Sequence, residues 1–342
     1  MNAGDSRAIH PRISVVIAAK DAARFLPHVF DSLMNSTIKD FEVVISDDCS
    51  SDNTVRMAEE WGAVVVRHPE SVGAAVARNH GAQRARSPIL FFTDHDCCVL
   101  PDTLERAIVS FQNLNEKTIL GGTYDIDPVD GEHFTSRFQS LHVHYSETRC
   151  DDPDYIASHA LVMDRESFLR EGGFPESLSR LLPNGCCQDV LMAHMMKKRG
   201  YRLKVDPGIL VLHMFNFTFY RSLKNAYWKS KSWIRVAMGS ARLISDSGSA
   251  STEMKLSGIT TGISACFFMA ALAHPVFLPL GLILYVISLL CNISFLRFLL
   301  KKSGLSFTIR ATPFYSIQLL VVLAGAIHGL LQGPIRPDSP DV

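Results

Sequence analysis

The sequence has no excess of charge of either sign: its 342 residues include 34 Lys and Arg and 34 Asp and Glu. It therefore lacks the basic surplus expected of a protein that binds a phosphate backbone, and we expect no nucleic-acid partner. None of its eight cysteines shows the CxxC spacing of a zinc site. Reduced thiols in a cytosolic compartment fit this pattern best.

Other signals are missing as well. The first residues lack the apolar run of a secretory signal, which predicts that the chain after Pro11 folds on the side of synthesis. The first strand-to-helix turn reads AKDAAR at residues 19–24, without the glycine fingerprint of a dinucleotide site. A dinucleotide-dependent oxidoreductase is therefore disfavoured.

What the sequence does have is an alternation of strand and helix patterns. Runs typical of strands occur at residues 13–19, 41–46, 63–66 and 89–96, with helical patterns between them. This order predicts an α/β fold with a mostly parallel central sheet and right-handed crossovers.

Residues 89–96 read ILFFTDHD, an uncharged run that ends in Asp94 and Asp96. Its pattern is that of a central strand covered on both faces. Ligands bind outside the carboxyl ends of parallel strands, and paired carboxylates there suit Mg²⁺ or Mn²⁺. The alternative is a solvated acidic turn that caps the next helix.

Asp47 and Asp48 close the second strand as Asp94 and Asp96 close the fourth, so both pairs should lie at the same edge of the sheet. One pair could accept hydrogen bonds from a nucleobase or ribose, and the other could hold a cation on a diphosphate. For Asp47 and Asp48 the alternative is an Asx-type turn with a helix cap.

Residues 12 to about 215 resemble a family 2 glycosyltransferase with the GT-A nucleotide-sugar-binding fold. Six ordered segments carry the resemblance: ISVVIAAKD (13–21), FEVVISDDCSSDNT (41–54), GAAVARNHG (73–81), FFTDHD (91–96), GGFPESL (172–178) and QDVLMAHMMKKRGY (188–201). The chain departs from the family at AAKD in the first strand, at Gln188, and at Cys49 and Cys97 beside the acidic motifs.

The resemblance implies a role for each matching position. Those expected to bind the nucleotide-sugar donor are Asp21, Asp47, Asp48, Arg78 and Asp94. Those expected to hold the divalent cation, Mg²⁺ or Mn²⁺, are Asp96, Asp94 and His213, with Asp96 as the direct ligand. For His213 an ordinary strand-end histidine remains an equal alternative.

On the acceptor side, the resemblance implies that Asp189 is the catalytic base and that Gly172, Gly173, Phe174 and Gln188 line the site. A helix is predicted over residues 188–198 with Asp189 in its first turn, so the alternative for Asp189 is a carboxylate that complements the N-terminus of that helix. Direct displacement with one base inverts the anomeric configuration. The activity implied is a metal-dependent, inverting glycosyl transfer, and its alternative is an inactive, membrane-tethered protein that only binds a nucleotide sugar.

Residues 121–170 contain scattered histidines, of which His142 and His144 alternate as on a strand. No ligand recurs at zinc spacing, so surface or acceptor-pocket positions are favoured for them.

Residues 216–255 are expected to form a basic amphipathic helix at the membrane surface, followed by a linker. Arg221, Lys224, Lys231, Arg235 and Arg242 follow one stripe, and Phe219, Leu223, Tyr227, Trp233 and Ile234 the other. The QxxRW signature of processive polysaccharide synthases is absent.

Residues 256–331 are expected to supply about three transmembrane helices, because residues 257–295 and 312–331 carry no charged side chain. The basic loop between these stretches predicts a multi-pass protein of the inner or plasma membrane with a cytosolic catalytic domain. Anchoring suggests a lipid or lipid-linked acceptor, used in cell-envelope polysaccharide or glycolipid synthesis. Tails are expected at residues 1–11 and 332–342.

Overall fold

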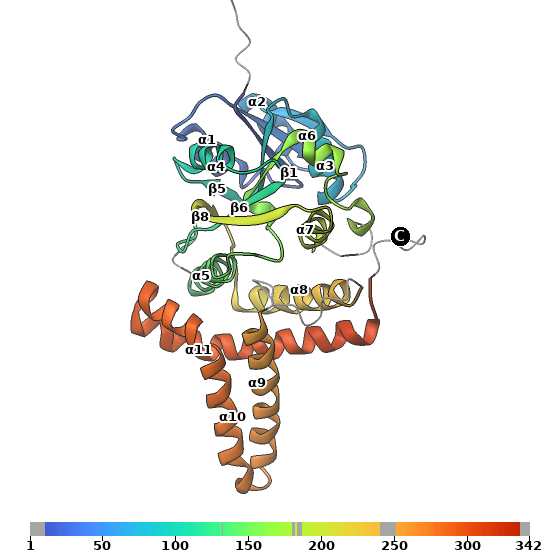
Figure 1. Ribbon diagram of the computed structural model, residues 1–342. Coiled ribbons are helices and arrows are strands. Elements are labelled where there is room, and N and C mark those ends of the chain that lie inside the picture. The colour runs from blue at the N-terminus through green and yellow to red at the C-terminus, as the bar shows by residue number, and fades with distance from the viewer. Residues whose placement is uncertain (1–10, 132, 180–181, 183–186, 240–250, 336–342) are drawn as a thin grey trace, which may run out of the picture. The chain divides into compact units, whose positions relative to one another are not determined.

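The computed structural model describes residues 11–131, 133–179, 182, 187–239 and 251–335, which form two compact units (Figure 1). One unit comprises Met1–Asp125 and Tyr155–Met214, and the other comprises Ile126–Asp154 and Phe215–Val342. Residues 126–154, which the sequence placed inside a domain spanning 12–215, thus group with the C-terminal helices. Arg242 and most of both predicted tails lie outside the described residues.

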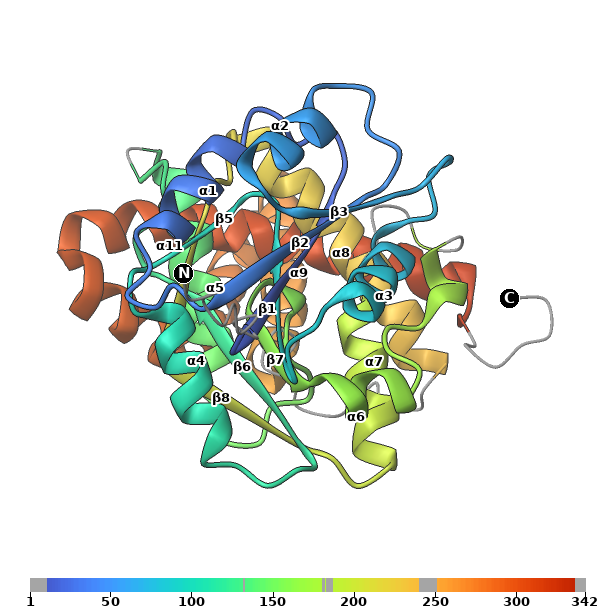
Figure 2. The same cartoon turned by 90° about the horizontal axis from the view of Figure 1, so that it is seen from above.

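The first unit is built on an eight-stranded sheet with the order β3-β2-β1-β4-β7-β6-β8-β5 (Figure 2). Strands β1 to β4 pair in parallel, which confirms the predicted alternation, whereas β7 and β5 run antiparallel to their neighbours. The strands are β1 (Ile13–Ala19), β2 (Phe41–Asp47), β3 (Val64–Arg67), β4 (Ile89–Asp94), β5 (Cys97–Val99), β6 (Thr118–Tyr124), β7 (Leu161–Asp164) and β8 (Arg202–His213).

Helices cover the sheet because each supplies an apolar or small-residue face. Phe91 and Phe92 of β4 are both fully buried, as expected of a central strand. Gly81 of α3 lies so close to the sheet that a Cβ there would be 2.7 Å from a methyl of Val16. The helices of this unit are α1 (Leu26–Met34), α2 (Thr54–Trp61), α3 (Ala74–Arg84), α4 (Thr103–Gln112), α6 (Arg165–Arg170) and α7 (Gln188–Lys198).

Glu42 is a buried carboxylate at the start of β2. It accepts hydrogen bonds from the Ser14 hydroxyl at 2.5 Å and from the backbone N–H and Nε of Arg86 at 2.6 and 2.8 Å. Burial by itself raises the pKa of Glu42, but these hydrogen bonds and the Arg86 charge outweigh it and leave the pKa lowered. The ionised form therefore stabilises the fold.

We expect Glu42→Gln to lower the free energy of unfolding at pH 7 by about 1–3 kcal/mol, because it weakens hydrogen bonds to a buried charge. A lowered folded-state pKa means that this contribution is present above the ordinary value of 4.5 and is lost as pH falls through the folded value. Denaturant unfolding of both proteins at pH 7 and pH 4 measures it. A difference that does not shrink at pH 4 would contradict the assignment.

The second unit is helical. Its helices are α5 (Phe134–Thr148), α8 (Phe219–Gly239), α9 (Thr252–Ala271), α10 (Leu278–Cys291) and α11 (Ile293–Gln332). His142 and His144 therefore lie on a helix, and the strand-like alternation predicted for them is wrong. Burial lowers the pKa of His142 to about 4, so its ring is neutral at physiological pH.

The α8 helix corrects part of the predicted basic stripe. Arg221 and Lys224 are exposed, but Lys231 is only 8% exposed, and its ammonium lies 4.6 Å from the ring centroid of Trp228. A cation–π contact with an aromatic face stabilises a charge that has little access to water. The prediction of a continuous exposed cationic face on α8 is therefore wrong at Lys231.

Two described helices are long and apolar enough to cross a membrane, α9 and α11, and residues 275–291 form a shorter apolar helical stretch. Figure 1 shows α9 and α10 side by side as a hairpin, with α8 and the long part of α11 running across its base. Polar groups join the hairpin: the hydroxyls of Ser257 and Thr261 lie 2.7 and 2.6 Å from that of Ser288.

Candidate functional site

The acidic residues at the ends of β2 and β4 lie at one edge of the sheet. In the paired register, Ala19 of β1 lies beside Asp47 of β2, and Ala18 lies beside Asp94 of β4. The geometric part of the sequence prediction is therefore confirmed. Only β1 separates the two acidic positions, so one small ligand can reach both.

Asp48 holds the loop that leads into α3. Its carboxylate accepts hydrogen bonds from the Ser71 hydroxyl at 2.9 Å and from the backbone N–H groups of Val72 and Gly73 at 2.5 and 3.0 Å. Asp47 is 3% exposed, and its Oδ1 has no hydrogen-bond partner among the described residues. A buried carboxylate oxygen without a donor is an unsatisfied hydrogen-bond acceptor.

Asp21 braces the neighbouring turn. It adopts a positive φ of 48°, and its carboxylate accepts hydrogen bonds from the backbone N–H and hydroxyl of Ser51 at 2.8 and 3.0 Å. These hydrogen bonds lower the pKa of Asp21, so it is ionised at neutral pH. Asp21 and Asp48 thus both fix the loops beside the sheet edge.

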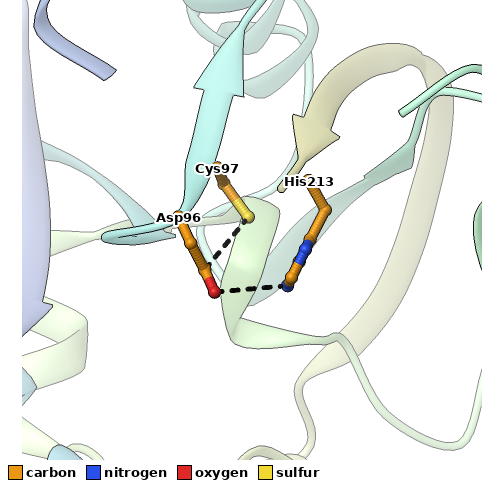
Figure 3. A group of neighbouring side chains, drawn as sticks. All are labelled: Asp96, Cys97 and His213. Atoms are coloured by element: carbon orange, nitrogen blue, oxygen red, sulfur yellow. Dashed lines mark hydrogen bonds and ion pairs between the residues drawn. The ribbon is translucent and has the colours of Figure 1, made fainter. Parts of the chain in front are cut away.

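Asp96, Cys97 and His213 form the group best placed to hold a metal ion (Figure 3). Strands β5 and β8 pair Cys97 with His213, which brings His213 Nε2 to 3.6 Å from Asp96 Oδ2. One potential ligand atom from each residue lies within 4.8 Å of the others. Carboxylate oxygen and imidazole nitrogen suit Mn²⁺, and the set as a whole fits a divalent cation.

The sequence did not identify Cys97 as a possible ligand or Tyr124 and His159 as neighbours of the site. Burial, together with the charges of Asp96 and Asp94, raises the pKa of the Cys97 thiol well above its ordinary value. Tyr124 stacks on His159 with ring centroids 3.9 Å apart and meets His213 edge-on at 5.1 Å. Only the pairing of distant strands joins these residues.

Asp94 is engaged by Arg78 rather than grouped with Asp96. Arg78 Nη2 donates to Asp94 Oδ1 at 2.7 Å, and Nη1 lies 3.5 Å from Gln188 Oε1. Burial opposes ionisation of Asp94, but the charges of Arg78 and His159 and the Arg78 hydrogen bond leave its pKa lowered. Arg78 thus links the end of β4 to the first residue of α7.

Asp189 lies in the first turn of α7, whose bounds, Gln188–Lys198, are those predicted. It is half-buried, and its Oδ1 accepts a hydrogen bond from the backbone N–H of Val190 at 2.9 Å. Gln188 is 1% exposed beside it. A carboxylate here complements the helix dipole.

The predicted acceptor-side segment is held by Asn79, which the sequence did not single out. The Asn79 amide donates to Phe174 O and its Oδ1 accepts from Phe174 N–H, both at 2.9 Å. Gly173 has φ +64°, and a Cβ there would lie 2.4 Å from Asn79 Oδ1. The Asn79 side chain therefore forms the two hydrogen bonds with the backbone of Phe174 that a neighbouring strand would form.

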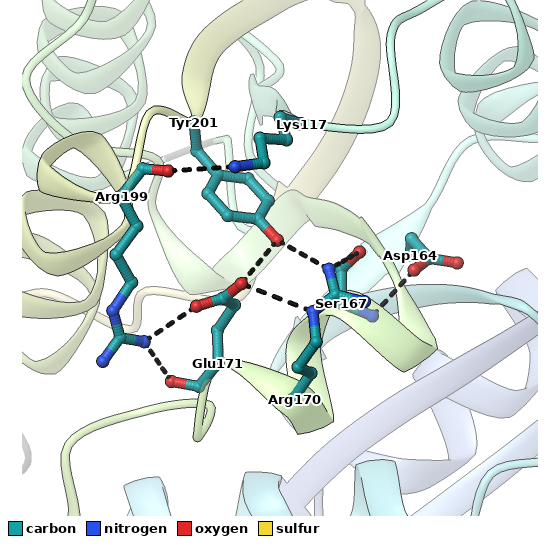
Figure 4. Close-up of polar contacts among 7 residues, drawn as sticks. All are labelled: Lys117, Asp164, Ser167, Arg170, Glu171, Arg199 and Tyr201. Atoms are coloured by element: carbon teal, nitrogen blue, oxygen red, sulfur yellow. Dashed lines mark hydrogen bonds and ion pairs between the residues drawn. The ribbon is translucent and has the colours of Figure 1, made fainter.

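The same segment is fixed from its other side (Figure 4). Glu171, which precedes Gly172, accepts hydrogen bonds from Arg199 at 3.1 Å and from the Tyr201 hydroxyl at 3.2 Å. Both donors lie just beyond the C-terminus of α7. The segment is thus tied to the C-terminal end of α7.

We expect Gly173→Ala to destabilise the protein more than Gly172→Ala. Both glycines have positive φ, which costs an alanine about 1–2 kcal/mol. A Cβ at Gly172 has no atom within 4 Å, whereas one at Gly173 disrupts the Asn79 pairing, which adds about 1–3 kcal/mol. Denaturant unfolding compares the pair, and equal losses would contradict this account.

Residues 14–169 match the family model described as Glycosyl transferase family 2. A Haemophilus influenzae protein called an uncharacterized glycosyltransferase is 29% identical over 182 residues, which cover 49% of this chain and 58% of that protein. A pre-mycofactocin glycosyltransferase of Mycobacterium tuberculosis is 26% identical over 229 residues, which cover 61% and 46%. The chain thus spans about half the length of these curated relatives.

Among solved structures, the mannosyltransferase PcManGT from Pyrobaculum calidifontis, in complex with GDP-Man and Mn²⁺, has a TM-score of 0.57 and 17% identity. The match covers 94% of this chain and 88% of that one. At this identity the likeness concerns the fold alone, and it confirms the predicted GT-A architecture.

Proposed function

We propose, from the match of residues 14–169 to the Glycosyl transferase family 2 model, that this protein is a membrane-anchored, metal-dependent, inverting glycosyltransferase. It transfers a sugar from a nucleotide-diphosphate sugar to a hydroxyl or phosphate of a lipid or lipid-linked acceptor. The observation that carries the proposal is the joining of three elements at one sheet edge. Arg78 links Asp94 to the start of α7, where Asp189 lies. Asp96, two residues after Asp94, faces His213.

The proposed donor site is divided between the acidic ends of β2 and β4. The loops braced by Asp21 and Asp48 hold the nucleoside, and the free oxygen of Asp47 accepts a hydrogen bond from it. Asp96 and His213, with Asp94 beside them, hold a divalent cation. When bound, the cation acts as a Lewis acid that neutralises charge on the diphosphate leaving group.

The proposed acceptor site lies at the start of α7. Asp189 takes the proton from the acceptor hydroxyl, whose oxygen attacks the anomeric carbon opposite the leaving diphosphate. Phe174 and the glycines before it, held by Asn79, form the wall of this site, and Gln188 keeps Arg78 directed at Asp94. A single base and a single displacement invert the anomeric configuration.

The lipid-linked acceptor is proposed from the apolar hairpin. Residues 257–295 carry no charged side chain, and α9 is long enough to cross a membrane. An enzyme anchored in this way meets lipid acceptors at high local concentration. Transfer to polyprenyl phosphate in vesicles, compared with transfer to soluble sugars, tests this part: equal use of soluble acceptors without lipid would contradict it.

The donor site is tested by the thermal stability of the detergent-purified protein with a panel of nucleotide diphosphates, with and without Mn²⁺. Binding stabilises the native state by mass action, about 2.7 kcal/mol at 100 times Kd. Stabilisation by one nucleotide that depends on Mn²⁺ supports the proposal. Stabilisation without sugar transfer to any acceptor would favour a protein that only binds nucleotide sugars.

A further inference from the structure

The long C-terminal helix α11 consists of two consecutive helical segments separated at Gly304. Its backbone leaves the helical region at Gly304, where φ is 78° and ψ is 175°, so residues 293–303 and 305–332 are separate segments. The second segment contains the stretch 312–331 that the sequence predicts as a third membrane span. Its contacts within the second unit give it a different place.

Residues 305–332 run parallel to α8 and pack closely against it. Gln318 donates to the Ser222 hydroxyl at 3.3 Å, the Ser230 hydroxyl donates to Val322 O at 2.7 Å, and Arg235 Nε donates to Gly333 O at 3.2 Å. These contacts advance in the same direction along both helices. Two members of the predicted apolar stripe of α8, Tyr227 and Ile234, also lie against this segment, whereas Phe219 stays 51% exposed.

Glycines let these helices approach. A Cβ at Gly325 would lie 2.5 Å from Tyr227 O, and one at Gly329 would lie 2.6 Å from Lys231 O. The glycines are four residues apart, as in the small-residue contacts of membrane helices. A side chain at either position would clash with backbone atoms of α8, which move less readily than the end of a flexible side chain.

A second pair of glycines connects α11 to the start of the α9–α10 hairpin. A Cβ at Gly258 would lie 3.9 Å from Leu319 O, and one at Gly262 would lie 2.4 Å from a methyl of Leu323. Both glycines lie within the first eleven residues of α9. Residues 305–332 therefore cross the base of the hairpin and do not run beside it as a third parallel helix (Figure 1).

The remaining side of this segment is apolar and exposed. Leu305, Ile309, Ile317, Ile327 and Leu331 are 65%, 63%, 41%, 49% and 83% exposed. Their spacing, mostly in multiples of three or four residues, places them along one face of a helix. This stripe adjoins the hairpin, whose own outer surface exposes Ile259, Ile263, Leu282, Ile283 and Val286.

We propose that residues 305–332 lie in the plane of the bilayer surface, with the stripe Leu305 to Leu331 turned toward the acyl chains. The inference rests on the proposed function in one respect, the insertion of the α9–α10 hairpin. The partner of the stripe is lipid because the stripe continues the uncharged surface of that hairpin. The exposed cations Lys301 and Lys302 precede the segment and Arg310 lies in its first turns, as expected at the level of anionic headgroups.

Depth measurement separates an in-plane helix from a spanning one. Single cysteines replace Ile309, Ile317 and Ile327 in a variant whose exposed native cysteines are alanine, and each carries a nitroxide. The protein is reconstituted in phosphatidylcholine–phosphatidylglycerol vesicles, and depth is taken from the relative accessibility to O₂ and a water-soluble nickel chelate. Labels at Leu256, Ile263 and Leu272 along α9 provide the matched control series.

An in-plane helix predicts that all three α11 labels lie at one depth, about 5–10 Å below the headgroups. A spanning helix predicts that the Ile309 and Ile327 labels differ by about 27 Å along the membrane normal. A depth along α9 that is greatest at its middle label, Ile263, with a constant depth along α11, supports the inference. A depth along α11 that is likewise greatest at its middle label, Ile317, overturns the inference and leaves the anchor intact, whereas water-exposed labels along α9 overturn the anchor itself.

Discussion

Asp96→Ala is expected to reduce sugar transfer by at least about 100-fold, because it removes the carboxylate that faces His213 across the proposed cation site. The loss has a second signature that does not depend on turnover. Titration of free Mn²⁺ by electron paramagnetic resonance should show binding to the native protein and none to the variant at the same concentration. Stabilisation by a nucleotide diphosphate in the presence of Mn²⁺ should be lost as well.

The control for Asp96 is Asp102→Asn. Asp102 pairs with Arg106 at 2.5 Å on the surface, and exposed pairs of this kind contribute about 0–1 kcal/mol. This variant should retain transfer, Mn²⁺ binding and nucleotide stabilisation. If Asp96→Ala kept Mn²⁺ binding and activity near the native level, the cation site would have to be sought elsewhere in the chain.

The sheet edge could be predicted because its signals are local. Each strand of the first half is a short apolar run, and parallel pairing follows from the helices between the runs. The register of β1 with β2 and β4 then places Asp47 and Asp94 as expected. The α7 helix has the bounds predicted for it, Gln188–Lys198.

The remaining parts of the site depend on contacts between distant segments. Cys97 meets His213 only because β5 pairs with β8, and Asn79 meets Phe174 only because a loop folds back onto α3. Neither pairing has a periodicity that a single sequence displays. The packing of residues 305–332 against α8 could not be predicted for a related reason: hydropathy reports that residues are apolar but not whether a neighbouring helix contacts them.

Asp189→Asn is expected to lower the turnover of transfer by about 100- to 10,000-fold, the range that a positioned general base contributes. Asparagine keeps the size of the side chain and can still accept the hydrogen bond that Val190 N–H donates to Asp189. What it loses is the capacity to take a proton. Steady-state kinetics with acceptor at saturation measure the change, and donor KM should remain near its native value.

Two comparisons separate this catalytic role from a purely structural one. Loss of a charge at a helix N-terminus costs about 0.3–1 kcal/mol of stability, so a structural role predicts a lower unfolding temperature with transfer largely intact. Asp206→Asn, which changes a carboxylate that accepts from the Ser110 hydroxyl at 2.6 Å, is the matched control and should leave turnover unchanged.

Nucleotide stabilisation supplies the other comparison. If Asp189 acts only on the acceptor, its variant keeps Mn²⁺-dependent stabilisation by nucleotide while Asp96→Ala loses it, and loss of that stabilisation in both would assign Asp189 to the donor site.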